Sequence, residues 1–297
     1  MCILALIDNI KKKLDKHKDK DWFIFLEKFL HGIFEDEVPA VGGQLTYFLI
    51  LSIFPFLIFF LNILSYTSIA QEEILDNLLI VLPIETQILL KGIVREIVGY
   101  SSETLLSLGI ILSLWTGSLG ITAIIRAVNK AYDVEKRRPY WKLKSLAIIF
   151  TVALALVLII VLSMLVFGEV IGRRIFSIFG ATHVFYHIWE FFRIIIPFLS
   201  MVVIFALLYK FSPTPGQGVD IKFKDAIPGA LFAAVGWIIA SMVFSFYVNN
   251  FGNYSKTYGS LGGIIILLLW LYISSITILL GGEINGAYAY VKRNNQK

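Results

Sequence analysis

The stretch TYGSLGGIIILLLWLYISSITILLGG, residues 257–282, contains no Asp, Glu, Lys or Arg. A helix that crosses the hydrocarbon core of a bilayer needs about 20 consecutive, mostly apolar residues. This stretch exceeds that length, whereas a soluble helix of the same length would carry charged residues along one face. It therefore predicts a transmembrane helix.

Further uncharged runs precede it at residues 38–71, 104–125, 145–168, 194–209 and 226–255. The shortest, 194–209, is flanked by Arg193 and Lys210, whose long stems can reach the two membrane interfaces. A hydrophobic fraction of 58% against a charged fraction of 16% is also unlike a soluble domain. We predict an all-α polytopic bundle of six transmembrane helices, at about 41–66, 104–125, 145–169, 190–210, 227–250 and 259–282.

Lysine and arginine indicate how the bundle is oriented. With six spans, 20 of the 26 basic residues fall on the side of the two termini and six fall on the other. Because loops rich in Lys and Arg stay in the cytoplasm, both termini are predicted to be cytoplasmic. We divide the chain into a basic N-terminal segment (1–37), a transmembrane domain (38–286) and a basic tail (287–297). The single cysteine, Cys2, permits no internal disulfide.

Two segments outside the spans have amphipathic patterns. Apolar residues from Trp22 to Ile33 recur at helical spacing, which predicts a helix along the cytoplasmic membrane surface. The first external connection, residues 71–103, places Ile84 and Ile88 among charged residues, which predicts short amphipathic helices broken at Pro83. A partly disordered loop is the alternative for that connection.

Small residues and prolines stand out within the spans. Glycines spaced four apart let helix backbones approach closely, and a proline removes a backbone hydrogen bond. We predict roles in helix packing, or as hinges, for Pro55, Pro197, Gly259, Gly262, Gly263, Gly282 and Gly286.

Polar residues at membrane depth are costly and therefore mark candidate functional sites. The predicted topology brings six of them to a similar depth near the cytoplasmic ends of the first, second, fifth and sixth spans: Gln44, Arg126, Asn129, Asp225, Glu283 and Asn285. Within this candidate cluster, Arg126 and Glu283 are hypothesised to form an ion pair. The alternative is two separate charges at the membrane interface.

His183, His187 and Glu190 lie four and three residues apart, a spacing compatible with metal ligands on one helical face. Neighbouring Phe185 and Trp189 instead favour an aromatic belt at the interface. We predict no metal and no cofactor.

Several long motifs resemble the YihY/BrkB family of bacterial inner-membrane proteins. They are QLTYFLILSIFP (44–55), RAVNKAY (126–132), EKRRP (135–139), NYSKTYGSLGG (253–263), LWLY (269–272) and GEIN (282–285), and the resemblance covers residues 25–290. The family is expected to have six transmembrane helices, in agreement with the count above. The resemblance implies a multi-pass protein of the bacterial plasma membrane. Members have been associated with ribonuclease activity, with virulence or serum resistance, and with transport, including that of envelope lipid precursors.

A transporter or lipid-translocating protein explains these features together, since polar groups at one membrane end, glycine-lined helices and prolines permit a cavity. Membrane lipids are the expected partners, with anionic headgroups at the basic cytoplasmic face. The alternative is a noncatalytic scaffold or regulatory protein, with glycine faces forming contacts in a homo-oligomer. We expect neither ribonuclease nor other enzymatic activity, because the short aqueous loops carry no metal-binding carboxylate motif. The basic runs reflect topology, so no nucleic acid is expected.

Overall fold

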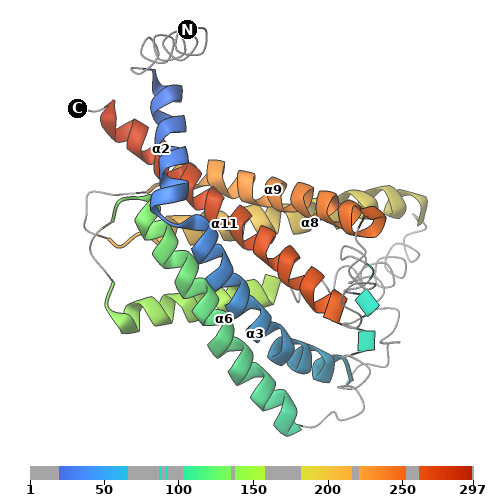
Figure 1. The fold of residues 1–297 in the computed structure, drawn as a ribbon. Helices are drawn as coiled ribbons and strands as arrows, with labels where there is room; N and C mark the ends of the chain where they lie inside the picture. Colours follow the sequence, from blue (N-terminus) through green and yellow to red (C-terminus); the bar gives the residue numbers. More distant parts are fainter. Residues whose placement is uncertain are drawn as a thin grey trace.

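The computed structural model describes residues 20–65, 84, 87–88, 91–92, 103–134, 138–157, 182–215, 221–251 and 261–295. These parts of the chain are helical throughout, with no strand, apart from short connections (Figure 1). Six of the helices are long and apolar enough to cross a membrane. The prediction of an all-α protein with six transmembrane helices is confirmed.

A short helix, α2 (Asp21–Glu35), precedes the six long ones. These are α3 (Val38–Ser65), α6 (Glu103–Ala131), the 140–157 helix (Tyr140–Val157), α8 (Thr182–Phe211), α9 (Phe223–Phe251) and α11 (Gly262–Asn294). α11 extends through residues 287–294, which were predicted to form a tail. The described residues of the connection between α3 and α6, at 84, 87–88 and 91–92, are helical.

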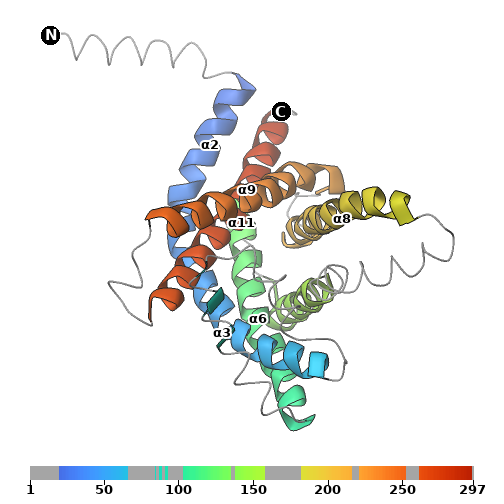
Figure 2. The same ribbon diagram turned by 90° about the vertical axis from the view of Figure 1, so that its right-hand side faces the viewer.

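Successive spans alternate in direction. One end of the bundle therefore holds the starts of α3, the 140–157 helix and α9 and the ends of α6, α8 and α11; we call it the basic end. α2 and the last turns of α11 project from the bundle at this end and lie next to each other (Figures 1 and 2). The ion pair between Lys28 of α2 and Asp133, just after α6, has an N–O distance of 2.9 Å and fastens α2 to the bundle.

Close backbone contacts hold the helices together where a glycine faces the backbone of a neighbouring helix. A methyl group at Gly229 of α9 would collide with the carbonyl oxygen of Gly281 of α11. A methyl group at Gly286 would likewise collide with the carbonyl oxygen of Ala131 at the end of α6. α11 therefore packs against both α9 and α6 through small residues.

The outer surface of the spans is apolar. Ile111 of α6, Ile149 of the 140–157 helix and Met242 of α9 expose 63%, 63% and 68% of their surface. Asn285 and Ser275 of α11, in contrast, are completely buried. This arrangement, with large apolar side chains outside and polar ones inside, suits a hydrocarbon surrounding.

α2 has one exposed apolar side, with Trp22, Leu26, Leu30 and Phe34 all exposed. The amphipathic N-terminal helix predicted from the sequence is therefore present over residues 21–35. Pro55 and Pro197 lie inside α3 and α8, as their positions in the sequence require.

Candidate functional site

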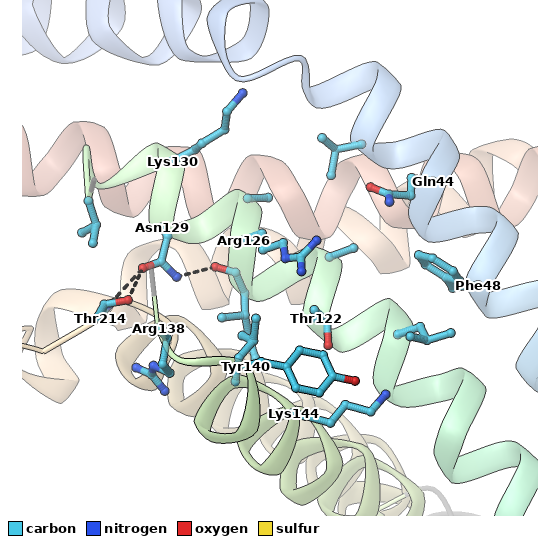
Figure 3. A pocket seen from close by; sticks show the side chains of 17 residues that line it. Gln44, Phe48, Thr122, Arg126, Asn129, Lys130, Arg138, Tyr140, Lys144 and Thr214 are labelled. Atoms are coloured by element: carbon cyan, nitrogen blue, oxygen red, sulfur yellow. Dashed lines mark hydrogen bonds between the residues drawn. The ribbon is translucent and has the colours of Figure 1, made fainter. Parts of the chain in front are cut away.

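A cavity of about 660 Å³ lies at the basic end between α3, α6 and the 140–157 helix (Figure 3). The connection after α8 contributes Thr214 to its wall. Gln44 and Phe48 line it from α3, facing Thr122 and Arg126 of α6. The volume is within the range of small-molecule binding sites.

The charged side chains that line this cavity are all basic: Arg126, Lys130, Arg138 and Lys144. None of the described lining residues is acidic. A cavity wall with several cations and no carboxylate attracts anions, and a low-dielectric surrounding strengthens that attraction.

Asn129 joins one wall of the cavity to the connection between α8 and α9. Its Nδ2 donates to the backbone carbonyls of Ile125 (2.6 Å) and Ser212 (2.8 Å). Its Oδ1 accepts hydrogen bonds from the backbone N–H and the hydroxyl of Thr214, both at 3.0 Å. The amide is fully hydrogen-bonded inside the protein, so it builds the wall instead of offering groups to a ligand.

Arg138 also has a structural function. Its Nη2 donates to the carbonyls of Phe211 (3.0 Å), the last residue of α8, and of Ser212 (3.5 Å) and Pro213 (2.9 Å), which follow it. Burial lowers the pKa of its guanidinium, yet an arginine still remains charged at neutral pH. Arg138 therefore holds the end of α8 and adds a fixed positive charge to the cavity.

Lys144 is buried, with 7% of its surface exposed. Its Nζ donates to the hydroxyl of Ser118 at 2.6 Å and lies 4.3 Å from the centre of the Trp115 ring. Both partners are neutral groups of α6. A buried ammonium without a carboxylate partner is unfavourable by itself, because the charge has lost its hydration.

Arg126 and Glu283 do not form the hypothesised ion pair: both are described, and no ion pair joins them in the described part of the chain. α6 packs on α11 through Val128 and Ala131, which contact Gly282 and Gly286. Arg126 precedes Val128 by two residues, a rotation of about 200° around a helix. Arg126 consequently faces the cavity, away from α11.

Glu283 instead faces α2. It is 4% exposed, and a methyl group at Gly32 of α2 would lie 2.5 Å from its Oε2. Its carboxyl group also hydrogen-bonds to that of Asp36, which follows α2. Burial raises the pKa of Asp36, while the charges of Lys130 and Lys28 and the hydrogen bond oppose this shift.

The other two members of the predicted cluster connect α9 to α11. The Asn285 side chain accepts a hydrogen bond from the Gly229 N–H (2.8 Å) and donates one to the Ala226 carbonyl (3.0 Å). Asp225 forms an ion pair with Lys292 at 2.8 Å. The six predicted residues thus share one end of the bundle but divide into three groups. The first group lines the cavity and consists of Gln44, Arg126 and Asn129. The second is Glu283, which faces α2, and the third is Asp225 and Asn285, which connect α9 to α11.

Some predicted positions lie outside the described residues: Gly259 and the side chains of His183, His187 and Glu190. In the described part of the chain, no group of three or more His, Cys, Asp or Glu could hold a metal ion. Gly262 and Gly263 are buried at the start of α11.

From the sequence, Lys144 was counted only among the basic residues that set the topology, Arg138 was noted only there and in the EKRRP motif, and Asp36 was not singled out. A signal for Lys144 was present, because it immediately precedes the uncharged third span and a lysine so close to hydrocarbon needs a polar partner. No comparable signal marks Arg138, whose partners are backbone carbonyls about 73 residues away.

Comparison with known proteins gives a consistent result. The sequence profile of the family "Virulence factor BrkB" matches residues 29–297. The ribonuclease-like protein YfkH of Bacillus subtilis is 38% identical over 261 residues, covering 88% of this chain and 94% of that protein. A UPF0761 membrane protein of Pseudoalteromonas atlantica is 28% identical (88% and 84% covered), and one of Tolumonas auensis 27% (86% and 82%). No solved structure matches.

Proposed function

The chain belongs to the BrkB family of multi-pass membrane proteins, and we propose that it is a transporter or a lipid-translocating protein. The observation that carries this proposal is the cavity between α3, α6 and the 140–157 helix. It combines basic and polar groups with an apolar wall at the end of the transmembrane helices, which is a suitable place for a substrate to enter.

The proposal includes an orientation. We place the basic end on the cytoplasmic side of a bacterial plasma membrane, because 20 of 26 Lys and Arg residues belong to that side. The cavity then faces the cytoplasm and the cytoplasmic leaflet, where anionic lipids are found. Membrane lipids are accordingly the partners we propose, and no enzymatic activity is part of the proposal.

Reconstitution tests the proposal directly. The purified protein is incorporated into liposomes, and two readouts are recorded: transbilayer movement of fluorescent phospholipids, and efflux of trapped radiolabelled phosphate or glutamate. We expect at least one readout to exceed that of protein-free liposomes. Liposomes that contain folded protein and show neither activity would refute the proposal.

A matched pair of variants on α6 links the activity to the cavity. Thr122→Phe places a ring on the cavity wall, whereas Ile111→Phe changes an outward-facing position on the same helix. We expect Thr122→Phe to reduce the activity by at least tenfold and Ile111→Phe to leave it near the wild-type level. Equal effects of the two substitutions would place the pathway elsewhere.

A scaffold function was the alternative from the sequence, with glycine faces available for oligomer contacts. Gly282 and Gly286 contact α6 within the same chain, at Val128 and Ala131. Since these glycines already serve packing inside the protein, they lend the scaffold alternative no support.

A further inference from the structure

The four basic side chains that line the cavity differ in how many interactions they already make within the protein. Arg138 donates to three backbone carbonyls, and Lys130 is attracted by the carboxylate of Asp36, which is not among the cavity's lining residues. Arg126 and Lys144 have no such anionic or carbonyl partners among the described residues. Within the described part of the chain, Arg126 and Lys144 are thus the lining cations with neither a carboxylate nor a carbonyl partner, which leaves them for a ligand.

Arg126 extends from α6 on the side that faces α3, where Gln44 lies on the opposite wall (Figure 3). Its guanidinium makes no ion pair or hydrogen bond to any other described residue. The amide of Gln44 is likewise exposed at the cavity and provides two further donors. A ligand between the two helices would thus meet donors from both.

Lys144 has a fixed position on the wall that the 140–157 helix forms. The Trp115 ring and the Ser118 hydroxyl hold its ammonium, and that hydroxyl accepts only one of its three N–H donors. Because this buried ammonium has no counter-charge among the residues that the structure describes, an anion in the cavity would restore the interaction energy that desolvation removed.

We propose that Arg126 and Lys144 bind a phosphate group in this cavity, with Gln44 as an additional donor. The inference rests on the proposed function, in which the cavity is the entrance for the substrate, and it names the chemistry of that substrate. Phosphate fits the donor set, since a guanidinium fork binds two phosphate oxygens at once and a lysine acts as a point charge.

The size and the lining of the cavity favour a phosphate that is part of a larger molecule. A volume of about 660 Å³ is far larger than a monatomic anion requires. Phe48, Leu119 and Leu143 contribute apolar surface beside the basic residues. The two sources of such a group are a phospholipid headgroup and a free phosphate compound, and the experiment separates them.

Ligand-induced stabilisation measures binding without requiring transport. The purified protein in an uncharged maltoside detergent is heated with inorganic phosphate, with short-chain phosphatidic acid, or with short-chain phosphatidylcholine at equal concentrations. A ligand that binds the folded state raises the unfolding temperature in a saturable manner. We expect saturable stabilisation of the wild type by phosphatidic acid, by inorganic phosphate, or by both.

The variants are Arg126→Gln, Lys144→Met and, as a matched control, Lys224→Gln, which removes an exposed cation at the same end but outside the cavity. We expect Arg126→Gln and Lys144→Met each to weaken binding about tenfold or more, since each removes charge-assisted hydrogen bonds. Arg126→Lys should retain part of the affinity. Lys224→Gln should bind as the wild type does.

Each outcome decides the inference. Stabilisation by phosphatidic acid alone identifies the ligand as a lipid headgroup, and stabilisation by inorganic phosphate identifies it as a free phosphate compound. Either result supports the phosphate site. The inference is overturned when neither phosphatidic acid nor inorganic phosphate stabilises the wild type. It is also overturned when Lys224→Gln loses as much affinity as Arg126→Gln and Lys144→Met, because this would indicate an effect of surface charge only. Binding without flux in liposomes would instead refute the proposed function while the phosphate site stands.

Discussion

Replacing Gly229 by alanine tests the close packing of α9 on α11. The added methyl group would collide with the backbone carbonyl of Gly281 and would lie 2.6 Å from Asn285 Cγ. A backbone atom cannot rotate out of the way, so the two helices have to separate. That separation also breaks two hydrogen bonds, the one that the Gly229 N–H donates to Asn285 and the one that Asn285 donates to the Ala226 carbonyl.

The magnitude follows from three contributions. Overpacking against backbone costs about 3 kcal/mol, the upper part of its usual range. Loss of two hydrogen bonds costs about 2 kcal/mol. Alanine is a better helix former than glycine by about 1 kcal/mol, which offsets part of this. We expect Gly229→Ala to lower the free energy of unfolding by about 4 kcal/mol.

Gly43→Ala is the matched control, since a methyl group at Gly43 of α3 would meet no atom within 4 Å. It should raise stability by about 0.5–1 kcal/mol, through helix propensity alone. Both variants are unfolded reversibly in mixed micelles of dodecylmaltoside and SDS, with helix content followed by circular dichroism. If Gly229→Ala proves as stable as Gly43→Ala, the close approach of α9 and α11 is wrong.

Asn129→Leu should lower the free energy of unfolding by about 2–3 kcal/mol in the same assay, because the N–H and hydroxyl of Thr214 lose their acceptor. A change below about 0.5 kcal/mol would show that Asn129 and Thr214 are not hydrogen-bonded. Burial raises the pKa of Asp36 in the folded protein above its value in the unfolded chain. The folded protein is therefore stabilised by the protonated Asp36 carboxyl at a pH below the unfolded-state pKa, and this stabilisation is lost as the pH rises through the folded-state pKa. The unfolding temperature should therefore fall with rising pH more in the wild type than in Asp36→Asn, and identical pH profiles would contradict this account. Without added phosphate, Lys144→Met should be as stable as the wild type or more so, because an unpaired buried charge is removed; a lower unfolding temperature would show that the ammonium is stabilising where it lies.

The spans could be predicted from the sequence because the length of an apolar run is a local property. The run from Gly262 to Gly282 must cross the bilayer whatever its neighbours are. The helix before the first span was predictable for the same reason, since its apolar side is visible in the spacing of Trp22, Leu26 and Phe29.

The site was predictable in depth but not in direction. Membrane depth follows from position along a span, and it brings Arg126 and Glu283 to one end of the bundle. Which side chains meet depends on the rotation of each helix, and this is set by contacts such as those of Val128 and Ala131 with glycines of α11. A single sequence does not show how each helix is rotated about its axis. For this reason the sequence suggested an ion pair between Arg126 and Glu283, whereas in the structure Arg126 faces the cavity and Glu283 faces α2.

The hydrogen bonds of Asn129 have a consequence for the biosynthesis of this protein. Their partners Ser212 and Thr214 come 83 and 85 residues later in the chain, after the third and fourth spans. During translation the Asn129 amide can pair only with Ile125 of its own helix, and its bonds to Ser212 and Thr214 have to wait until the fourth span has emerged from the ribosome and folded back. The cavity is therefore completed late, and a nascent chain that stops before the fourth span inserts three spans without the wall that Thr214 provides.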